Sequence, residues 1–146
     1  MFNLERFIKA QECGDSYNTA ISEIKNGLKC SHWIWYVFPQ IRGLGRSQFS
    51  YEYGISSLQE AKAYLENEVL NDRLREAVLA MMAHEGNRSA EDVLGPLDAK
   101  KFRSCLTLFD IASPDDIYAK ALTSLFGGKK CFRTEEIVKK KQSKPI

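Results

Sequence analysis

The sequence predicts a single all-α, multihelical domain, and three observations lead to this fold class. Apolar residues recur at intervals of three and four along most of the chain, which places them on one face of a helix. No stretch alternates apolar and polar residues in steps of two, and no Asn-Gly pair marks a hairpin. The length of 146 residues suits one core, and 44% hydrophobic with 27% charged residues is typical of a globular domain.

Two helices are predicted in the first thirty residues. Apolar residues within 4–8 share one helical face, and Asn3 stands just before them, where its side chain can cap the free amides of the first turn. A second apolar face extends over residues 17–28. Gly27 is expected to end this helix, because glycine readily adopts the left-handed conformation found at helix C-termini.

The middle of the chain predicts one short and one long helix. Ser57 and Glu60 have the spacing of a capping box, in which each side chain satisfies a backbone amide of the first turn. A short helix is therefore expected directly after Ser57. An apolar stripe within residues 70–81 predicts the long helix, which Gly86 ends.

Three more helices are predicted in the last third. Asp98 is the candidate cap of the first, whose apolar face lies within residues 102–109. Ser113 is the candidate cap of the second, over residues 117–126, because a proline follows it, and a glycine pair ends that helix. Thr134 is the candidate start of a last, short helix.

The predicted domain occupies residues 1–138. Residues 139–146 contain four lysines and no apolar face, so they are expected to form a basic, frayed C-terminal tail. We interpret this tail as a solvated terminus rather than as a contact site for nucleic acid or lipid.

Composition argues against several classes of function. Lys and Arg number 21 against 19 Asp and Glu, so the chain lacks the positive field that draws proteins onto nucleic acid. No apolar stretch approaches the roughly 20 residues of a membrane span, and the start of the chain does not resemble a signal peptide, so no membrane partner and a cytoplasmic location are expected. Four widely spaced cysteines and two histidines predict free thiols, no metal site and no cofactor.

Residues 30–47, which read CSHWIWYVFPQIRGLGRS, form the most unusual segment. Both tryptophans, one histidine and a Gly-x-Gly turn fall within these eighteen positions. Ser31 is a candidate cap for a short helix over residues 32–38, and Pro39 must end that helix because it has no amide hydrogen. Such a helix is apolar nearly all round, which predicts that it lies in the interior.

The aromatic side chains of this segment belong to the core on the simplest interpretation. The alternative is that Trp35 lines a pocket and stacks on a flat ligand ring. His32 shares a helical face with Trp35 and is a structural residue, a ligand contact or a general acid–base catalyst. A buried Gln40 would need hydrogen-bond partners, so it is either structural or part of a site.

The Gly-x-Gly turn has the components of an anion site. Gly43 and Gly45 provide a flexible backbone, while Arg46 and Ser47 supply a guanidinium and a hydroxyl group. The turn lacks the third glycine of a dinucleotide fingerprint and the lysine of a P-loop, so neither nucleotide fold is indicated. A plain turn is the alternative interpretation.

A second polar cluster is predicted near the start of the helix that follows Asp98. It contains Asp98, Lys101, Arg103 and Ser104, and the amides of a first helical turn favour anions. The alternative is capping together with solvated charge.

Three stretches, SHWIWYVFPQIRGLGRS, SLQEAKAYLENEVLNDRLRE and KFRSCLTLF, resemble a known family. They are similar to the mainly bacterial family catalogued as domain of unknown function 1810, some members of which carry an unsupported "calpastatin" label. The resemblance implies a single multihelical domain and brings no established activity. Relatives often have an aspartate shortly before the equivalent of Thr134, where this chain has other residues. The hallmark positions fall here on His32, Trp33, Trp35, Phe38, Pro39, Gln40, Gly43, Gly45, Ser47, Lys101 and Ser104.

The leading hypothesis is that the protein binds a small, anionic, ring-bearing, nucleotide-like ligand in a pocket built from residues 32–47 and the turn at residues 101–104. Arg46 and Lys101 would hold the anion, Gln40 and Ser47 would orient it, and Trp35 would stack on the ring. With His32 as general acid–base catalyst, the same pocket would serve a hydrolase or glycosidase acting on a nucleotide-derived metabolite. The alternative from another class is a protein-interaction or assembly domain that uses the tryptophans as an anchor. Whether the protein is an enzyme stays open on the sequence.

Overall fold

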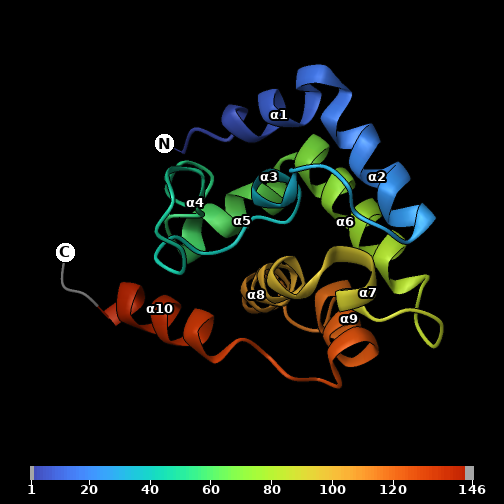
Figure 1. The fold of residues 1–146 in the computed structure, drawn as a ribbon. Coiled ribbons are helices and arrows are strands. Elements are labelled where there is room, and N and C mark those ends of the chain that lie inside the picture. Colours follow the sequence, from blue (N-terminus) through green and yellow to red (C-terminus); the bar gives the residue numbers. More distant parts are fainter. Residues whose placement is uncertain (1, 144–146) are drawn as a thin grey trace.

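Every regular element of the computed structural model, which describes residues 2–143, is a helix, and this confirms the predicted fold class (Figure 1). An isolated bridge between Ile41 and Ile55 adds one extended pairing within these residues. The elements in chain order are α1 (Glu5–Glu12), the 3-10 helix η1 (Cys13–Asp15), α2 (Ser16–Asn26), α3 (Ile34–Val37), α4 (Gln48–Glu52), α5 (Leu58–Glu66), α6 (Glu68–Met82), α7 (Ala90–Leu94), α8 (Pro96–Ala112), α9 (Ile117–Phe126) and α10 (Phe132–Ser143).

Helix α8 forms the centre of the fold. It packs against α5, α7, α9 and α10, and in Figure 1 it is seen nearly end-on between them. Phe102, Cys105, Leu106 and Phe109 of this helix are fully buried. Because other helices surround α8, its apolar residues extend beyond the single stripe of a surface helix.

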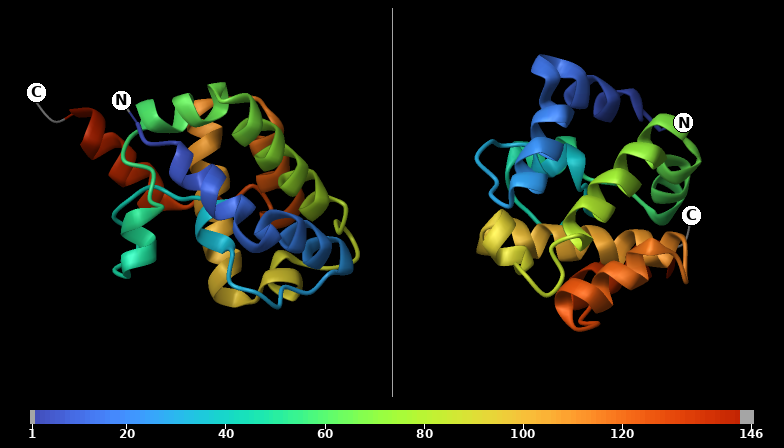
Figure 2. Two further views of the ribbon diagram at one scale, coloured as in Figure 1. Left: turned by 90° about the horizontal axis from the view of Figure 1, so that it is seen from above. Right: turned by 90° about the vertical axis from the view of Figure 1, so that its right-hand side faces the viewer.

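Helices α1 and α2 pack over α3 and α6 on one side of the molecule (Figures 1 and 2). Phe7 of α1 meets Tyr64 of α5 edge to face, with ring centroids 5.2 Å apart. His84, just after α6, is buried, and its Nε2 lies 2.6 Å from the backbone oxygen of Ile24. The imidazole therefore joins the ends of α6 and α2.

Several predicted helix ends are confirmed by the backbone. Gly27 ends α2 with a φ of +82°, and Gly127 ends α9 with a φ of +61°. Ser57 caps α5, since its hydroxyl accepts a 3.1 Å hydrogen bond from the Glu60 amide. Its capping box is incomplete, because the Glu60 carboxylate bonds to the amide of Ser56 instead.

Other predicted caps are wrong. Leu4 stands at the N-cap of α1 in place of Asn3, and Asp116 caps α9. The Ser113 hydroxyl donates to Asp116, so the serine supports the cap from outside the helix. Helix α10 begins before Thr134.

Two short helices, α4 and α7, have no counterpart among the predicted elements. Each has five residues, too few to show a helical repeat in an apolar pattern. Ser47 caps α4 and Ser89 caps α7 in a complete capping box with Asp92.

The C-terminal helix α10 lies at the edge of the molecule beside α8 (Figure 2). It continues to residue 143, so residues 139–143 of the predicted tail are helical and residues 144–146 lie outside the described part of the chain. None of the helices in residues 2–143 has the length and apolar character needed to cross a membrane.

Candidate functional site

The two tryptophans of the aromatic segment have different environments. Trp33 is 1% exposed, and its indole Nε1 donates a 2.9 Å hydrogen bond to Glu23. Trp35 is only partly buried and packs beside α4. Trp33 is therefore a core residue, while Trp35 can be reached from solvent.

Glu23 of α2 holds the start of this segment. Its carboxylate accepts hydrogen bonds from the amides of Cys30 and Ser31, from the Ser31 hydroxyl and from Trp33. Burial by itself raises the pKa of Glu23, but these bonds to the charged form outweigh it and lower the pKa to about 2. Because its hydroxyl donates to Glu23, Ser31 is not the predicted cap, and α3 begins only at Ile34.

Trp35, Phe49, Asp98 and Lys101 form a cluster that we call the Trp35 surface. Lys101 Nζ lies 5.0 Å from the Trp35 ring centroid, a cation–π distance, and the Phe49 ring lies 5.2 Å from it. Asp98 pairs with Lys101 at 3.3 Å and with Lys29 at 2.8 Å. The fold thus brings Trp35 and Lys101 together, and Asp98 is an ion-pair partner where a helix cap was predicted.

The other polar residues predicted for the site differ in exposure and in their partners. His32 and Arg46 are exposed, and neither side chain has a polar partner within residues 2–143. Gln40 is buried, and its side-chain amide likewise has no hydrogen-bond partner in that range. Ser104 lies inside α8, away from its first turn, with its hydroxyl 3.3 Å from Cys131 Sγ.

The Gly-x-Gly turn leads directly into α4. Gly43 has a φ of +115°, which favours glycine, and a Cβ atom at Gly45 would lie 2.7 Å from Ser50 Cβ. The Ser47 hydroxyl accepts a 3.1 Å hydrogen bond from the Ser50 amide. These contacts give Gly43, Gly45 and Ser47 a structural role in the turn.

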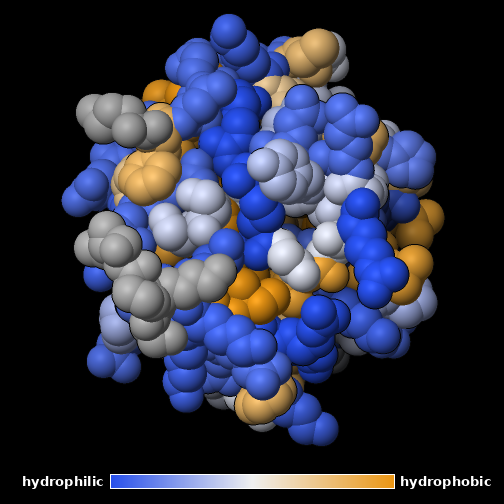
Figure 3. Space-filling model, turned by 90° about the vertical axis from the view of Figure 1, so that its left-hand side faces the viewer, coloured by the Kyte–Doolittle hydropathy of each residue, from blue (hydrophilic) through white to orange (hydrophobic). Residues whose placement is uncertain are grey.

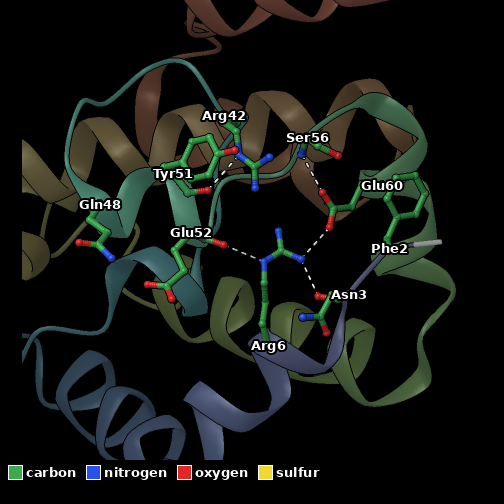
Figure 4. A pocket seen from close by; sticks show the side chains of 9 residues that line it. All are labelled: Phe2, Asn3, Arg6, Arg42, Gln48, Tyr51, Glu52, Ser56 and Glu60. Atoms are coloured by element: carbon green, nitrogen blue, oxygen red, sulfur yellow. Dashed lines mark hydrogen bonds and ion pairs between the residues drawn. The ribbon is translucent and has the colours of Figure 1, made fainter.

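A cavity of about 500 Å³ opens next to a different face of α4 (Figure 4). Helix α1, the turn before α4 and the start of α5 complete its walls. The lining side chains belong to Phe2, Asn3, Arg6, Arg42, Gln48, Tyr51, Glu52, Ser56 and Glu60. We call it the Arg42 cavity.

Arg6 and Glu60 form a buried ion pair on one wall of the Arg42 cavity. Arg6 Nη1 lies 2.8 Å from Glu60 Oε2, and the guanidinium also donates to backbone oxygens at positions 3, 52 and 54 over 2.6–2.9 Å. Burial raises the pKa of Glu60, but hydrogen bonds from Arg6 and Ser56 outweigh it, so the net pKa is lowered. Arg6 is therefore largely committed to the fold.

Arg42 is less committed. Its Nε donates a 2.9 Å hydrogen bond to the backbone oxygen of Tyr51, and its guanidinium carbon lies 4.3 Å from the Tyr51 ring centroid. Figure 4 shows the guanidinium directed into the cavity. Its two terminal amino groups have no partner within residues 2–143, so they offer a fork of N–H donors that suits a carboxylate or phosphate.

Sequence reasoning missed the Arg42 cavity because its residues come from distant parts of the chain. Arg6 and Glu60 are 54 positions apart and look like ordinary surface charges of two amphipathic helices. One signal was present: Arg42 stands directly before the Gly-x-Gly turn.

Comparisons with known proteins support the fold and give no activity. The model of a family described as "Protein of unknown function (DUF1810)" matches residues 1–138. The crystal structure of the conserved hypothetical protein Rv1873 from Mycobacterium tuberculosis has a TM-score of 0.89 and 39% sequence identity, and the match covers 94% of this chain and 97% of that chain. No match is found among the curated proteins.

Proposed function

Because this chain belongs to the DUF1810 family of proteins of unknown function, as its sequence motifs indicated, we propose a function from its own residues. The protein binds a small, anionic, ring-bearing molecule in the Arg42 cavity. The observation that carries this proposal is the Arg42 guanidinium, which faces the cavity with its terminal amino groups unpaired.

Among the charged residues that line the cavity, Arg42 is the one that favours an anionic ligand. Glu60 neutralises Arg6, and a second acid, Glu52, lies across the cavity from Arg42 (Figure 4). Glu52 forms no ion pair with Arg42 within residues 2–143, so the terminal amino groups of Arg42 can bind a phosphate or carboxylate through two parallel hydrogen bonds. Gln48 can donate or accept hydrogen bonds, and the Glu52 carboxylate can accept them from hydroxyl or amino groups of the same ligand.

Two aromatic side chains supply apolar area for a ring. Tyr51 is 66% exposed and Phe2 is 42% exposed, and they lie on opposite sides of the cavity in Figure 4. Exposed aromatic rings that line a cavity with the terminal amino groups of Arg42 form a site for a molecule that is apolar at one end and charged at the other. A volume of about 500 Å³ accommodates a molecule of nucleoside monophosphate size.

The Trp35 surface is the second location for the same function. There, Lys101 lies against the Trp35 ring, and the unpaired Gln40, exposed Arg46 and Ser47 are the remaining predicted contacts. In this version the ligand anion binds Lys101 and Arg46, and His32 is the acid–base group if the ligand is a substrate. The two locations lie on either side of α4. Binding in the Arg42 cavity should depend on Arg42, whereas binding at the Trp35 surface should depend on Lys101.

The experiment is a thermal-shift and calorimetric titration with adenosine 5′-monophosphate, adenosine and ribose 5-phosphate. The monophosphate is expected to stabilise the protein more than either fragment, because it carries both ring and anion. At about one hundred times its dissociation constant it would add about 2.7 kcal/mol, or roughly 5–10 °C in Tm for a chain of this length.

Three arginine or lysine variants locate the site. Arg42→Met is expected to weaken binding at least about tenfold, whereas Arg133→Met, which removes an exposed arginine on α10, leaves it unchanged. If Lys101→Met abolishes binding and Arg42→Met does not, the Trp35 surface is the site. If none of the three compounds binds, the proposal that the cavity binds a nucleoside monophosphate of this kind is wrong.

A protein-interaction role is the second candidate function, and the exposed aromatics of α4 favour it. Phe49 is 53% exposed and is close in sequence to Tyr51. Most of the face that Figure 3 shows is hydrophilic, with one apolar area at its centre and others nearer its edges. If α4 is an anchor for a second copy, sedimentation at rising concentration will show association that Phe49→Ser removes.

We propose that the protein is located in the cytoplasm and has no membrane or nucleic-acid partner. All four cysteines are free, which suits a reducing compartment. The nearly balanced charge of the chain also disfavours general attraction to nucleic acid.

A further inference from the structure

A second, smaller cavity lies between the starts of α7 and α8 and the end of α9. Its volume is about 270 Å³. Lys100 and Arg103 of α8 line it together with Glu91 of α7 and with Leu125 and Phe126 of α9. None of these residues lines the Arg42 cavity, so the two cavities are separate.

Arg103 is an unpaired cation held partly inside the protein. Its Nε is buried and has no hydrogen-bond partner, and the guanidinium forms no ion pair within residues 2–143. A buried N–H group without an acceptor is destabilising, and natural proteins rarely keep one without a reason. The two terminal amino groups of Arg103 are not among the buried atoms and have no hydrogen-bond partner within residues 2–143, so they are the donors that a ligand can reach.

The charges around the cavity indicate a monoanion. Lys100, like Arg103, has no ion-pair partner in the described part of the chain, and Glu91 is the acid that lines the same cavity. Two positive charges and one negative charge leave an excess of one positive charge. A carboxylate balances this excess and matches the planar fork of the guanidinium.

The remaining wall is apolar. Leu125 and Phe126 are partly buried and pack against the core, and the Phe126 ring centroid lies 5.9 Å from that of Phe102. Such a wall suits a compact ring or short hydrocarbon, and the cavity has about half the volume of the Arg42 cavity. We propose that this cavity binds a small monocarboxylate with an apolar body, its carboxylate on Arg103 and its body on Leu125 and Phe126.

The test is a titration of the full chain, labelled with ¹⁵N, with benzoate and with its neutral analogue benzamide. Benzoate is expected to shift the amide resonances of residues 89–91, 99–103 and 124–126 in a saturable manner. Benzamide should bind at least about tenfold more weakly, because it lacks the charge that pairs with Arg103. This comparison uses the unmodified protein, so it does not depend on the folding of a variant.

Arg103→Gln and Arg133→Gln form a matched pair of variants. The first is expected to weaken benzoate binding at least about tenfold, and the second, at an exposed arginine, to leave it unchanged. The proposal is overturned if benzamide binds as well as benzoate, or if Arg103→Gln binds benzoate with unchanged affinity. It is also overturned if the shifted resonances lie around Arg42 and Tyr51, which would assign benzoate to the Arg42 cavity.

Discussion

Arg6 Nη1 and Glu60 Oε2 lie 2.8 Å apart at a place where the two side chains are only 16% and 3% exposed. This ion pair connects the first helix to the start of α5 and forms one wall of the Arg42 cavity. The two arginines of the cavity therefore have different roles. Arg6 stabilises the fold, and Arg42 retains N–H donors for a ligand.

The first prediction concerns the stability that this pair provides. Arg6→Met removes the cation and leaves the Glu60 carboxylate buried without its partner, which is expected to cost about 3–5 kcal/mol of unfolding free energy. Urea denaturation measures the change. Arg133→Met is the control and should shift stability by less than about 0.5 kcal/mol. Equal effects of the two variants would show that the Arg6–Glu60 pair does not stabilise the fold.

The second prediction concerns acid stability. Glu23 has an ordinary pKa near 4.5 and a folded pKa of about 2, and the folded pKa of Glu60 is also lowered. A lowered folded pKa adds stability that is complete above the unfolded pKa and is lost as the pH falls towards the folded pKa. The unfolding free energy should therefore fall between about pH 5 and pH 2.

Glu23→Gln tests which carboxylate produces this pH dependence. The variant cannot ionise, so its stability should fall less steeply between pH 5 and pH 2 than that of the parent protein. Glu136→Gln, on the exposed surface of α10, is the control and should retain the parent slope. An unchanged slope in Glu23→Gln would mean that Glu23 does not contribute to acid stability.

The third prediction concerns the reactivity of two cysteines. Burial raises the pKa of Cys105 well above its ordinary value. Burial also raises the pKa of Cys131, but hydrogen bonds from Ser104 and Thr134 and the charge of Arg103 outweigh it, so the net pKa is lowered. Iodoacetamide at pH 7.5 should therefore alkylate Cys131 and spare Cys105, as peptide mass spectrometry can measure.

Arg103→Gln tests whether the Arg103 charge contributes to the reactivity of Cys131. Loss of the positive charge should slow alkylation of Cys131 a few-fold, while the rate at the exposed Cys13 stays the same. If the rate at Cys131 does not change, the Arg103 charge does not stabilise the thiolate.

The fourth prediction separates the structural role of Ser47 from a role in binding. Ser47→Ala removes the cap of α4 and should destabilise the protein by about 1 kcal/mol, whereas Ser47→Asp retains a capping oxygen and should restore most of that loss. If Ser47 has only this role, both variants will bind adenosine 5′-monophosphate as the parent does. Weaker binding by Ser47→Asp at full stability would place Ser47 at the ligand.

The sequence anticipated much of the local structure. Apolar spacing over residues 70–81 and the glycines at 27 and 127 marked helices and their ends, because side-chain periodicity and left-handed backbone are local properties. It did not identify α4, whose five residues are shorter than the repeat that would reveal a helix. Ser31 was assigned to a helix cap because its acceptor, Glu23, belongs to a different helix.

By itself, the sequence determined an all-α domain and the family. Tertiary structure decided which polar groups remain available. It buried Trp33 and left Trp35 accessible, and it paired Asp98 with Lys29 and Arg6 with Glu60. Within the described residues 2–143 it left the terminal amino groups of Arg42 without a partner. The physical reason is that periodicity records which face of a helix is buried, whereas ion pairs and cavities depend on residues that meet only when distant helices pack together.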